Sequence, residues 1–191
     1  MFDEFKYGYY QTLRVEARSR IVNALNRRIK SPEDRERWRG ITLASINADA
    51  YEYARTEWAK YYGDETHRGL PHSWERLFFQ FTAKPAHFNL AVWQTIGENK
   101  ILQGLALGKP SGGKNHLTIN WVERSYAPTY FRGGVLLPVL ACAQEYAKLL
   151  GCQRVLVKDP VDAAVFAKYG YEPYSGSPKG GSYLFKELQH G

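Results

Sequence analysis

The order of hydrophobic and polar residues predicts a helical first part of the chain, followed by strands. Between residues 11 and 29 apolar residues recur at helical spacing, with arginines on the opposite face. The apolar positions are Leu13, Ala17, Ile21, Val22, Leu25 and Ile29. Before this helix, the alternation of Phe5, Tyr7 and Tyr9 predicts a short first strand.

Three further helices are predicted before residue 85. Ser31 followed by Pro32 is a helix-start signal, with Ser as the N-cap. A longer helix is predicted over 42–62, and 63–72 form a loop. The inward face of the longer helix consists of Leu43, Ile46, Ala50, Ala54, Trp58 and Tyr61. A short helix carrying Trp74, Leu77, Phe78 and Phe81 then ends before Pro85. This aromatic face indicates either core packing or one wall of a ligand pocket.

After residue 86 the hydrophobic period changes to two, which is typical of strands. The segments 87–95 and 101–107 flank a Gly97-Glu98-Asn99 turn, as in a hairpin. A second turn over 109–115 leads into a third strand at 116–124. We therefore expect three consecutive antiparallel strands.

The stretch 116–151 predicts a phosphate-binding element. A strand runs through a turn containing Arg132, Gly133 and Gly134 into a helix over 134–150. Backbone N–H groups are unpaired at the start of a helix, and the helix dipole adds positive potential there. Arg132 would add a cation, so a pyrophosphate is the expected ligand.

The last part of the chain predicts strand, helix and strand. The short apolar segment 154–157 should lie parallel to 116–124, because a right-handed helical crossover joins them. A helix over 161–168 and a final strand over 182–186 follow. Together, these elements predict a mixed α/β fold, with a mostly antiparallel sheet flanked by helices.

Composition and length are those of one globular domain over 1–191, with a mainly helical, basic part over 1–70 and a sheet part over 87–188. Cys142 and Cys152 suggest buried thiols in a reducing compartment. The sequence contains neither an apolar run long enough for a bilayer nor a signal-peptide pattern, so we expect a cytoplasmic protein without a membrane.

Positive charge is concentrated near the N-terminus. Residues 11–40 carry nine basic residues against four acids, which is +5 of the net +7. The basic residues are Arg14, Arg18, Arg20, Arg27, Arg28, Lys30, Arg35, Arg37 and Arg39. They form either a solvated helix face or a surface for an anionic partner, such as RNA or an acidic acceptor.

Three segments, ILQGLALG (101–108), FRGGVLLPVLACAQEYAKLLGCQRVLV (131–157) and DPVDAAVFAKYGYEP (159–173), together resemble the GNAT superfamily of acyl-CoA-dependent N-acyltransferases. The resemblance covers about 87–188. It implies a GNAT-like fold and an acyl-CoA co-substrate, most simply acetyl-CoA. An acyl group would pass directly to an amine acceptor of unknown identity.

The resemblance has departures in the glycine turn and in the closing segment. Placing Gly134 on the central glycine of the family's loop puts Phe131 at its Arg/Gln position. Placing Arg132 there instead puts Val135 at the central glycine. Asp159 occupies a usual Asn position, and Phe166 replaces a tyrosine that protonates the leaving thiolate in many members.

The resemblance also implies site residues. Those expected to bind the acyl-CoA are Trp121, Val122, Phe131, Arg132, Gly133, Gly134, Val135 and Asp159. Acyl transfer needs a base, donors to the oxyanion and an acid for the thiolate. Val122 would donate its backbone N–H to the oxyanion.

Glu123, at the end of its strand, is the candidate base; the alternative is a surface carboxylate paired with Arg124. Glu98 and Asn120 are weaker candidates. Tyr169 and Tyr126 are candidate acids, with ordinary packing as the alternative for each. Tyr171 is expected in the core.

No metal is expected, because the histidines do not group with the cysteines as in zinc sites. They are His67, His72, His87, His116 and His190.

An alternative function is a non-catalytic GNAT-like module that binds nucleic acid or a protein through its basic helices. A third hypothesis combines the two functions: an acetyltransferase whose acceptor is attached to RNA. A homodimer is compatible with either function.

Overall fold

The computed structural model describes residues 3–63, 69–129, 131, 134–176 and 180–190. Its elements, in chain order, are α1 (Glu4–Arg27), α2 (Pro32–Trp38), β1 (Ile41–Ala44), α3 (Ala48–Thr56), the 3-10 turn η1 (Trp58–Tyr61), α4 (Trp74–Thr82), β2 (Phe88–Ile96), β3 (Asn99–Pro110), β4 (His116–Arg124), α5 (Leu136–Leu149), β5 (Arg154–Lys158), α6 (Ala163–Ala167), β6 (Glu172–Pro173) and β7 (Tyr183–Glu187). Among the described residues, none of the helices has the length and apolar character needed to span a membrane.

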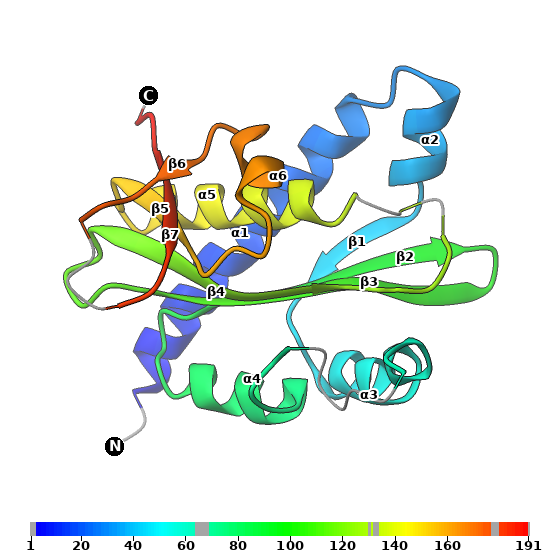
Figure 1. Ribbon diagram of the computed structural model, residues 1–191, viewed down its shortest axis with the longest axis horizontal. Coiled ribbons are helices and arrows are strands. Elements are labelled where there is room, and N and C mark those ends of the chain that lie inside the picture. The colour runs from blue at the N-terminus through cyan, green and yellow to red at the C-terminus, as the bar shows by residue number, and fades with distance from the viewer. Residues whose placement is uncertain (1–2, 64–68, 130, 132–133, 177–179, 191) are drawn as a thin grey trace.

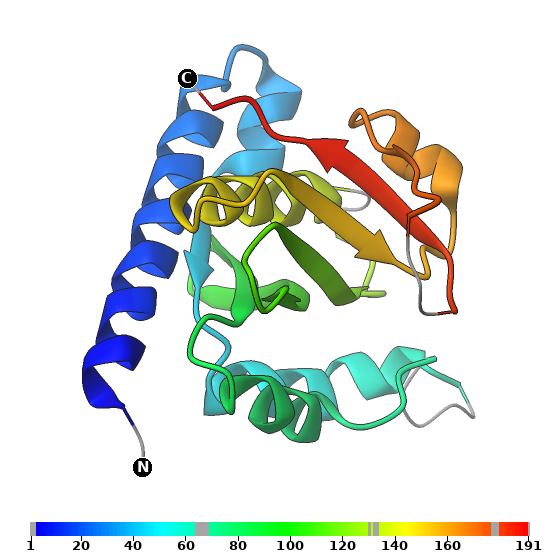
Figure 2. The ribbon, with the colours of Figure 1, turned by 90° about the vertical axis from the view of Figure 1, so that its left-hand side faces the viewer.

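The strands form one seven-stranded sheet in the order β1-β2-β3-β4-β5-β7-β6. Helices cover both faces, with α3 and α4 on one side and α5 and α6 on the other (Figure 1). Helix α1 runs along α5 and β1, which Figure 2 shows from a second direction. Two hydrophobic clusters fill the two interfaces, one beneath α1 and α5 and the other above α3 and α4.

The predicted strands from β2 to β5 are confirmed in their order and directions, whereas β1 and β6 were not predicted. β2, β3 and β4 are consecutive antiparallel strands, and β4 pairs with β5 in parallel. The predicted helix starts at Ser31 and before Trp74 are also present, as α2 and α4. Ser31 accepts a hydrogen bond from Asp34 N at 3.0 Å, which is the expected N-cap.

The predicted strand at the N-terminus is wrong, since Phe5, Tyr7 and Tyr9 lie in the first turns of α1. The side chain of Asp3 accepts from Lys6 N at 3.1 Å and caps this helix. Phe5 is 90% exposed and Tyr9 is 54% exposed, so neither needs a buried sheet face. The alternation of aromatic residues was coincidental.

The predicted helix over 42–62 is wrong at its start and divides into β1, α3 and η1. Asn47 accepts from Ala50 N at 3.0 Å and is the true N-cap. The residues before it pair with β2, from Ile41 opposite Gln94 to Ala44 opposite Ala91. Most of the predicted inward face is buried, but Tyr61 is 46% exposed and Tyr62 is buried instead.

Two arginines of the basic region are buried in the body of the protein. Arg14 is 2% exposed and donates from Nη1 to the carbonyl oxygens of Pro85 (2.8 Å) and His87 (2.9 Å). Arg18 donates to Ser45 Oγ and to the Asn89 carbonyl, each at 2.9 Å. Both side chains therefore fasten α1 to the rest of the fold and cannot contact an external anion.

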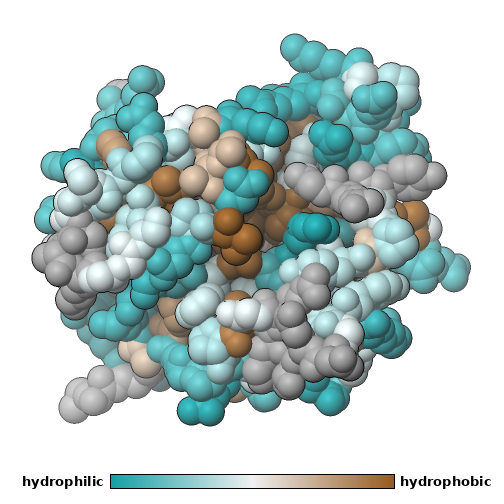
Figure 3. All heavy atoms as spheres, viewed as in Figure 1, coloured by the Kyte–Doolittle hydropathy of each residue, from teal (hydrophilic) through white to brown (hydrophobic). Residues whose placement is uncertain are grey.

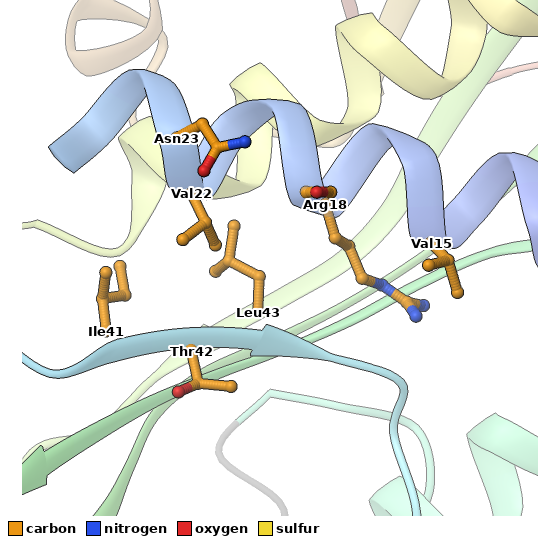
Figure 4. A pocket seen from close by; sticks show the side chains of 8 residues that line it. Val15, Arg18, Val22, Asn23, Ile41, Thr42 and Leu43 are labelled. Carbon is orange, nitrogen blue, oxygen red and sulfur yellow. The ribbon is translucent and has the colours of Figure 1, made fainter. Parts of the chain in front are cut away.

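Arg18 also lines a hollow of about 330 Å³ between α1 and β1. Figure 4 shows Val22 of α1 and Leu43 of β1 facing each other there, while the Arg18 guanidinium reaches toward the sheet. Burial lowers the pKa of Arg18 to about 10, so it remains charged near neutral pH.

Candidate active site

Strands β4 and β5 part in the middle of the sheet. Their parallel pairing runs from His116 opposite Arg154 to Ile119 opposite Val157. β4 then continues to Arg124. The far half of β4 thus presents an edge that β5 does not cover. An extended ligand could pair with that edge as an added strand.

A β-bulge lies at the point of parting. In the pairing of β3 with β4, Leu107 is opposite Trp121 and Gly108 is opposite Ile119, which leaves Asn120 as the additional residue. Gly108 permits this approach, because a Cβ there would lie 2.4 Å from the Thr118 carbonyl oxygen. The bulge turns the end of β4 away from β5.

Figure 3 shows the side of the molecule that faces the viewer in Figure 1, with the layer of α5 and α6 above the sheet and that of α3 and α4 below it. This side is hollowed near its middle, and hydrophobic atoms line the hollow among hydrophilic ones. Leu136, Phe166, Tyr169 and Val122 are partly buried against the cluster beneath α5. Apolar side chains therefore lie at the start of α5 and on α6.

Glu123 is buried at the end of β4, with 5% of its surface exposed. Its Oε1 accepts a hydrogen bond from the Tyr62 hydroxyl at 2.5 Å, and its Oε2 accepts one from Trp74 Nε1. The interpretation of Glu123 as a surface carboxylate is therefore wrong. A buried carboxylate with oriented donors is the kind of group that can act as a base in acyl transfer.

Tyr62 was not predicted as a site residue, and Trp74 was predicted only as part of an aromatic face that could be core or one wall of a ligand pocket. Tyr62 follows η1 and Trp74 begins α4, so both come from the helical layer beneath the sheet. The Tyr126 ring lies against the Tyr62 ring at 6.0 Å between centroids, edge to face. The structure thus brings the candidate residues Glu123 and Tyr126 together. The available sequence signal was the polar atom on each ring, the Tyr62 hydroxyl and the Trp74 indole N–H.

The segment after β4 is anchored by a chain of buried amides. Ser125 N donates to the Gln103 carbonyl at 2.8 Å, and Thr129 Oγ1 donates to Gln103 Oε1 at 3.2 Å. Gln103 Nε2 donates to Gln94 Oε1 at 3.1 Å, and Gln94 Nε2 donates to the Arg39 carbonyl at 3.0 Å. These bonds connect the loop that holds Tyr126 to the end of α2.

The start of α5 lies against β3 and β4 through a glycine. A Cβ on Gly104 would lie 2.3 Å from Val135 Cγ1, so this contact requires glycine. Val135 precedes the helix, and its side chain makes no capping hydrogen bond. The first N–H groups of a helix have no partner within it. In α5 these are the N–H groups of Leu136 and Leu137, because Pro138 has none and Val139 N already donates to the Val135 carbonyl. The helix start therefore offers two donors and the dipole to an anion such as pyrophosphate.

The predicted loop residues are placed in part. Phe131 is buried with its ring edge to face against Trp38, at 5.5 Å between centroids, so only its backbone could contact a ligand. Its carbonyl oxygen accepts from Gly134 N at 2.7 Å. Arg132 and Gly133 lie outside the described residues, and their predicted role stays a prediction.

Asp159 follows β5 in a left-handed conformation, with φ of +46°. Its Oδ1 accepts from Ser182 N at 2.9 Å, and its own N–H donates to the Ser182 carbonyl at 2.7 Å. Asp tolerates this conformation better than most residues. The residue therefore anchors the chain before β7, next to the strand that borders the gap.

Tyr169 lies on the other side of the sheet from Glu123. It packs with Phe166 against the cluster beneath α5, whereas Glu123 contacts residues of the opposite helical layer. The two candidate groups could meet only through the gap between β4 and β5. Tyr171 is 2% exposed and accepts from Gln144 Nε2 at 3.2 Å, as expected for a core residue. Glu98 lies exposed at the far hairpin.

The part of the chain that the structure describes contains no group of three His, Cys, Asp or Glu side chains that could hold a metal ion. The two cysteines are buried thiols. Burial raises the pKa of Cys142 to about 12 and that of Cys152 to about 11, so neither is a reactive thiolate near neutral pH.

Comparison with known proteins relates the fold to acetyltransferases. No protein-family model matches the sequence, and no curated protein matches it. Among solved structures, Ard1 from Thermoplasma volcanium is similar at 13% identity and a TM-score of 0.56, over 79% of this chain and 99% of that one. An acetyltransferase of the GNAT family from Staphylococcus aureus is similar at 9% identity and a TM-score of 0.57, over 78% and 99%.

A third similar structure is N-acetylglutamate synthase from Neisseria gonorrhoeae complexed with coenzyme A and N-acetyl-glutamate. Its identity is 16% and its TM-score 0.57, over 78% of this chain but 35% of that one. These likenesses show that the chain has the GNAT fold, and they confirm the fold predicted from the sequence.

Proposed function

We propose that the protein is an acyl-CoA-dependent N-acyltransferase that moves an acetyl group from acetyl-CoA directly to an amine. One observation carries the proposal. A buried carboxylate, Glu123, lies on the half of β4 that β5 leaves uncovered. The uncapped start of α5 packs on the neighbouring strand.

The pyrophosphate of acetyl-CoA would lie at the start of α5, and the pantetheine arm would extend into the gap beside β4. The neighbouring synthase is named as a complex with coenzyme A, which supports a CoA co-substrate for this fold. Trp121 and Val122 lie on the uncovered half of β4, where the arm would pass. Asp159 borders the gap from the side of β5.

Glu123 would take a proton from the acceptor amine. The amine nitrogen would then form a bond to the thioester carbonyl carbon, and the carbonyl oxygen would become an oxyanion that accepts a hydrogen bond from Val122 N–H. Collapse of this intermediate breaks the carbon–sulfur bond, and the thiolate takes a proton from Tyr169 or Tyr126. Tyr62 and Trp74 would keep the Glu123 carboxylate in place through their hydrogen bonds.

Calorimetric titration with acetyl-CoA tests the proposal. We expect saturable binding, and the absence of binding at tens of micromolar would overturn the proposal. Glu123→Gln keeps the shape of the side chain and removes its basicity. It should therefore bind acetyl-CoA like the unsubstituted protein but release far less free thiol in the presence of amines.

A second proposal is that the basic helices bind an anionic or RNA-linked acceptor. Seven of the nine basic residues in 11–40 remain exposed after Arg14 and Arg18 are buried. Arg27→Glu together with Arg28→Glu should then weaken acceptor use or RNA binding and leave acetyl-CoA affinity unchanged. A salt-sensitive RNA complex without acetyl-CoA binding would favour a non-catalytic module.

A further inference from the structure

The side chain of Asn120, in β4, has a buried oxygen, Oδ1, that accepts no hydrogen bond from the described residues. Buried polar atoms in folded proteins are nearly always hydrogen-bonded, because an unmet acceptor loses its bonds to water without replacement. This acceptor therefore needs a donor that the described residues do not supply.

The position of Asn120 in β4 indicates which part of a ligand could donate to it. It is the bulged residue of β4, directly after Ile119, where pairing with β5 ends. Successive side chains of a strand alternate between its faces. Ile119 packs beneath α5, whereas Trp121, two residues on, packs against the other helical layer, so the strand exchanges its faces across the bulged Asn120. Asn120 therefore stands at the inner end of the gap, three residues before Glu123.

We propose that Asn120 is a substrate-binding residue whose Oδ1 accepts a hydrogen bond from an amide N–H of the pantetheine arm of acyl-CoA. This inference rests on the proposed function. The pantetheine arm has two secondary amides, and an extended arm beside β4 would present an N–H toward the side chain at the bulge. Asn120 would thus set how deeply the arm enters, and so where the thioester lies relative to Glu123.

The test compares the affinities of variants for two ligands, measured by calorimetry. Asn120→Leu removes the acceptor and keeps much of the volume, and Asn120→Ala is a second variant in case Leu does not fit. Thr118→Val is the control, because it removes a hydroxyl from the same strand where β4 is still paired with β5. The ligands are acetyl-CoA and adenosine 3′,5′-bisphosphate, which lacks the pantetheine arm.

We expect Asn120→Leu to bind acetyl-CoA about three- to tenfold more weakly, as for the loss of one neutral hydrogen bond. Affinity for the bisphosphate should stay unchanged, and the thermal midpoint of the ligand-free variant should not fall. Thr118→Val should bind both ligands like the unsubstituted protein.

Three results would overturn the inference. The first is unchanged acetyl-CoA affinity in both Asn120 variants. The second is an equal loss for both ligands. The third is a destabilised ligand-free protein that still binds acetyl-CoA normally, which would make the residue structural. If the unsubstituted protein itself fails to bind acetyl-CoA, the proposed function fails; if it binds and the Asn120 variants bind equally well, only this inference fails.

Discussion

Gly104→Ala should both destabilise the protein and weaken acetyl-CoA binding, because it displaces the start of α5. The new Cβ would lie 2.3 Å from Val135 Cγ1 and 3.2 Å from Cγ2, whereas ordinary contacts are 3.4–4 Å. Val135 would have to retreat by about 1 Å, or the strand would have to shift, since close-packed interiors yield little. Overpacking of this kind costs about 1–3 kcal/mol.

The effect on ligand binding follows from the length of a hydrogen bond. Donor–acceptor distances cluster near 2.7–3.2 Å in proteins generally, and about 1 Å of displacement leaves the bond largely broken. A shift of the first turn of α5 would therefore move its N–H groups away from a bound pyrophosphate. We expect acetyl-CoA affinity to fall about tenfold or more, with affinity loss and destabilisation in the same variant.

A double-mutant cycle separates this contact from other effects of the substitution. Val135→Ala alone should cost about 2 kcal/mol for two lost methyl groups. In Gly104→Ala/Val135→Ala the new methyl occupies part of the vacated space. The double variant should therefore lose about as much free energy of unfolding as either single variant. That non-additivity, about 2 kcal/mol, lies in the range found for contacting residues.

Urea unfolding of the four proteins measures the cycle, and calorimetry measures acetyl-CoA affinity. Gly112→Ala is the matched control, since nothing lies within 4 Å of its Cβ position and its φ is not positive. It should leave stability and affinity unchanged. Strictly additive costs, or a Gly104→Ala protein as stable as the unsubstituted one, would refute the proposed packing of α5 on β3.

Three further predictions concern buried polar groups. Tyr62→Phe removes a donor that holds the Glu123 carboxylate, so the turnover rate should fall about three- to tenfold, whereas exposed Tyr61→Phe should leave it unchanged. Burial and the nearby Arg14 and Arg18 lower the pKa of His87 from 6.5 to about 4, so the unfolded chain takes up a proton in that interval while the folded protein does not. Stability should therefore fall by about 3 kcal/mol as pH drops from about 6.5 to 4, and urea unfolding of His87→Gln should show a smaller loss. Arg14→Met leaves two buried carbonyl oxygens without their donor and should cost about 2–4 kcal/mol, whereas exposed Arg37→Met should stay within about 0.5 kcal/mol in the same assay.

The sheet could be predicted from sequence because its central strands are regular over many residues. Strands β2, β3 and β4 have 9, 12 and 9 residues, and tight turns separate them. The boundary errors arose where one side chain decides the structure. Asn47 caps α3 and so excludes a helix from 42, but an asparagine among apolar residues is a weak signal on its own.

The position of Glu123 at the end of a strand was predictable, but its partners were not. Tyr62 is 61 residues away along the chain and Trp74 is 49 residues away. Such contacts depend on how the helical layer packs on the sheet, which local periodicity does not specify. Asn120 shows the same limit, since one additional residue in β4 decides which side chain stands at the gap.

The two buried arginines show why charge counting misled the prediction for the N-terminal region. Arg14 and Arg18 are one helical turn apart on α1, and in sequence they look like the exposed arginines around them. Arg14 Nε donates to Gln11 within α1, and the remaining hydrogen bonds of the two side chains go to the segment from Pro85 to Asn89 and to Ser45. Removing α1 would leave the buried carbonyls of that segment without donors and would uncover the cluster beneath α5. The part of the chain before β1 therefore supports the same helix whose start is proposed to bind the pyrophosphate.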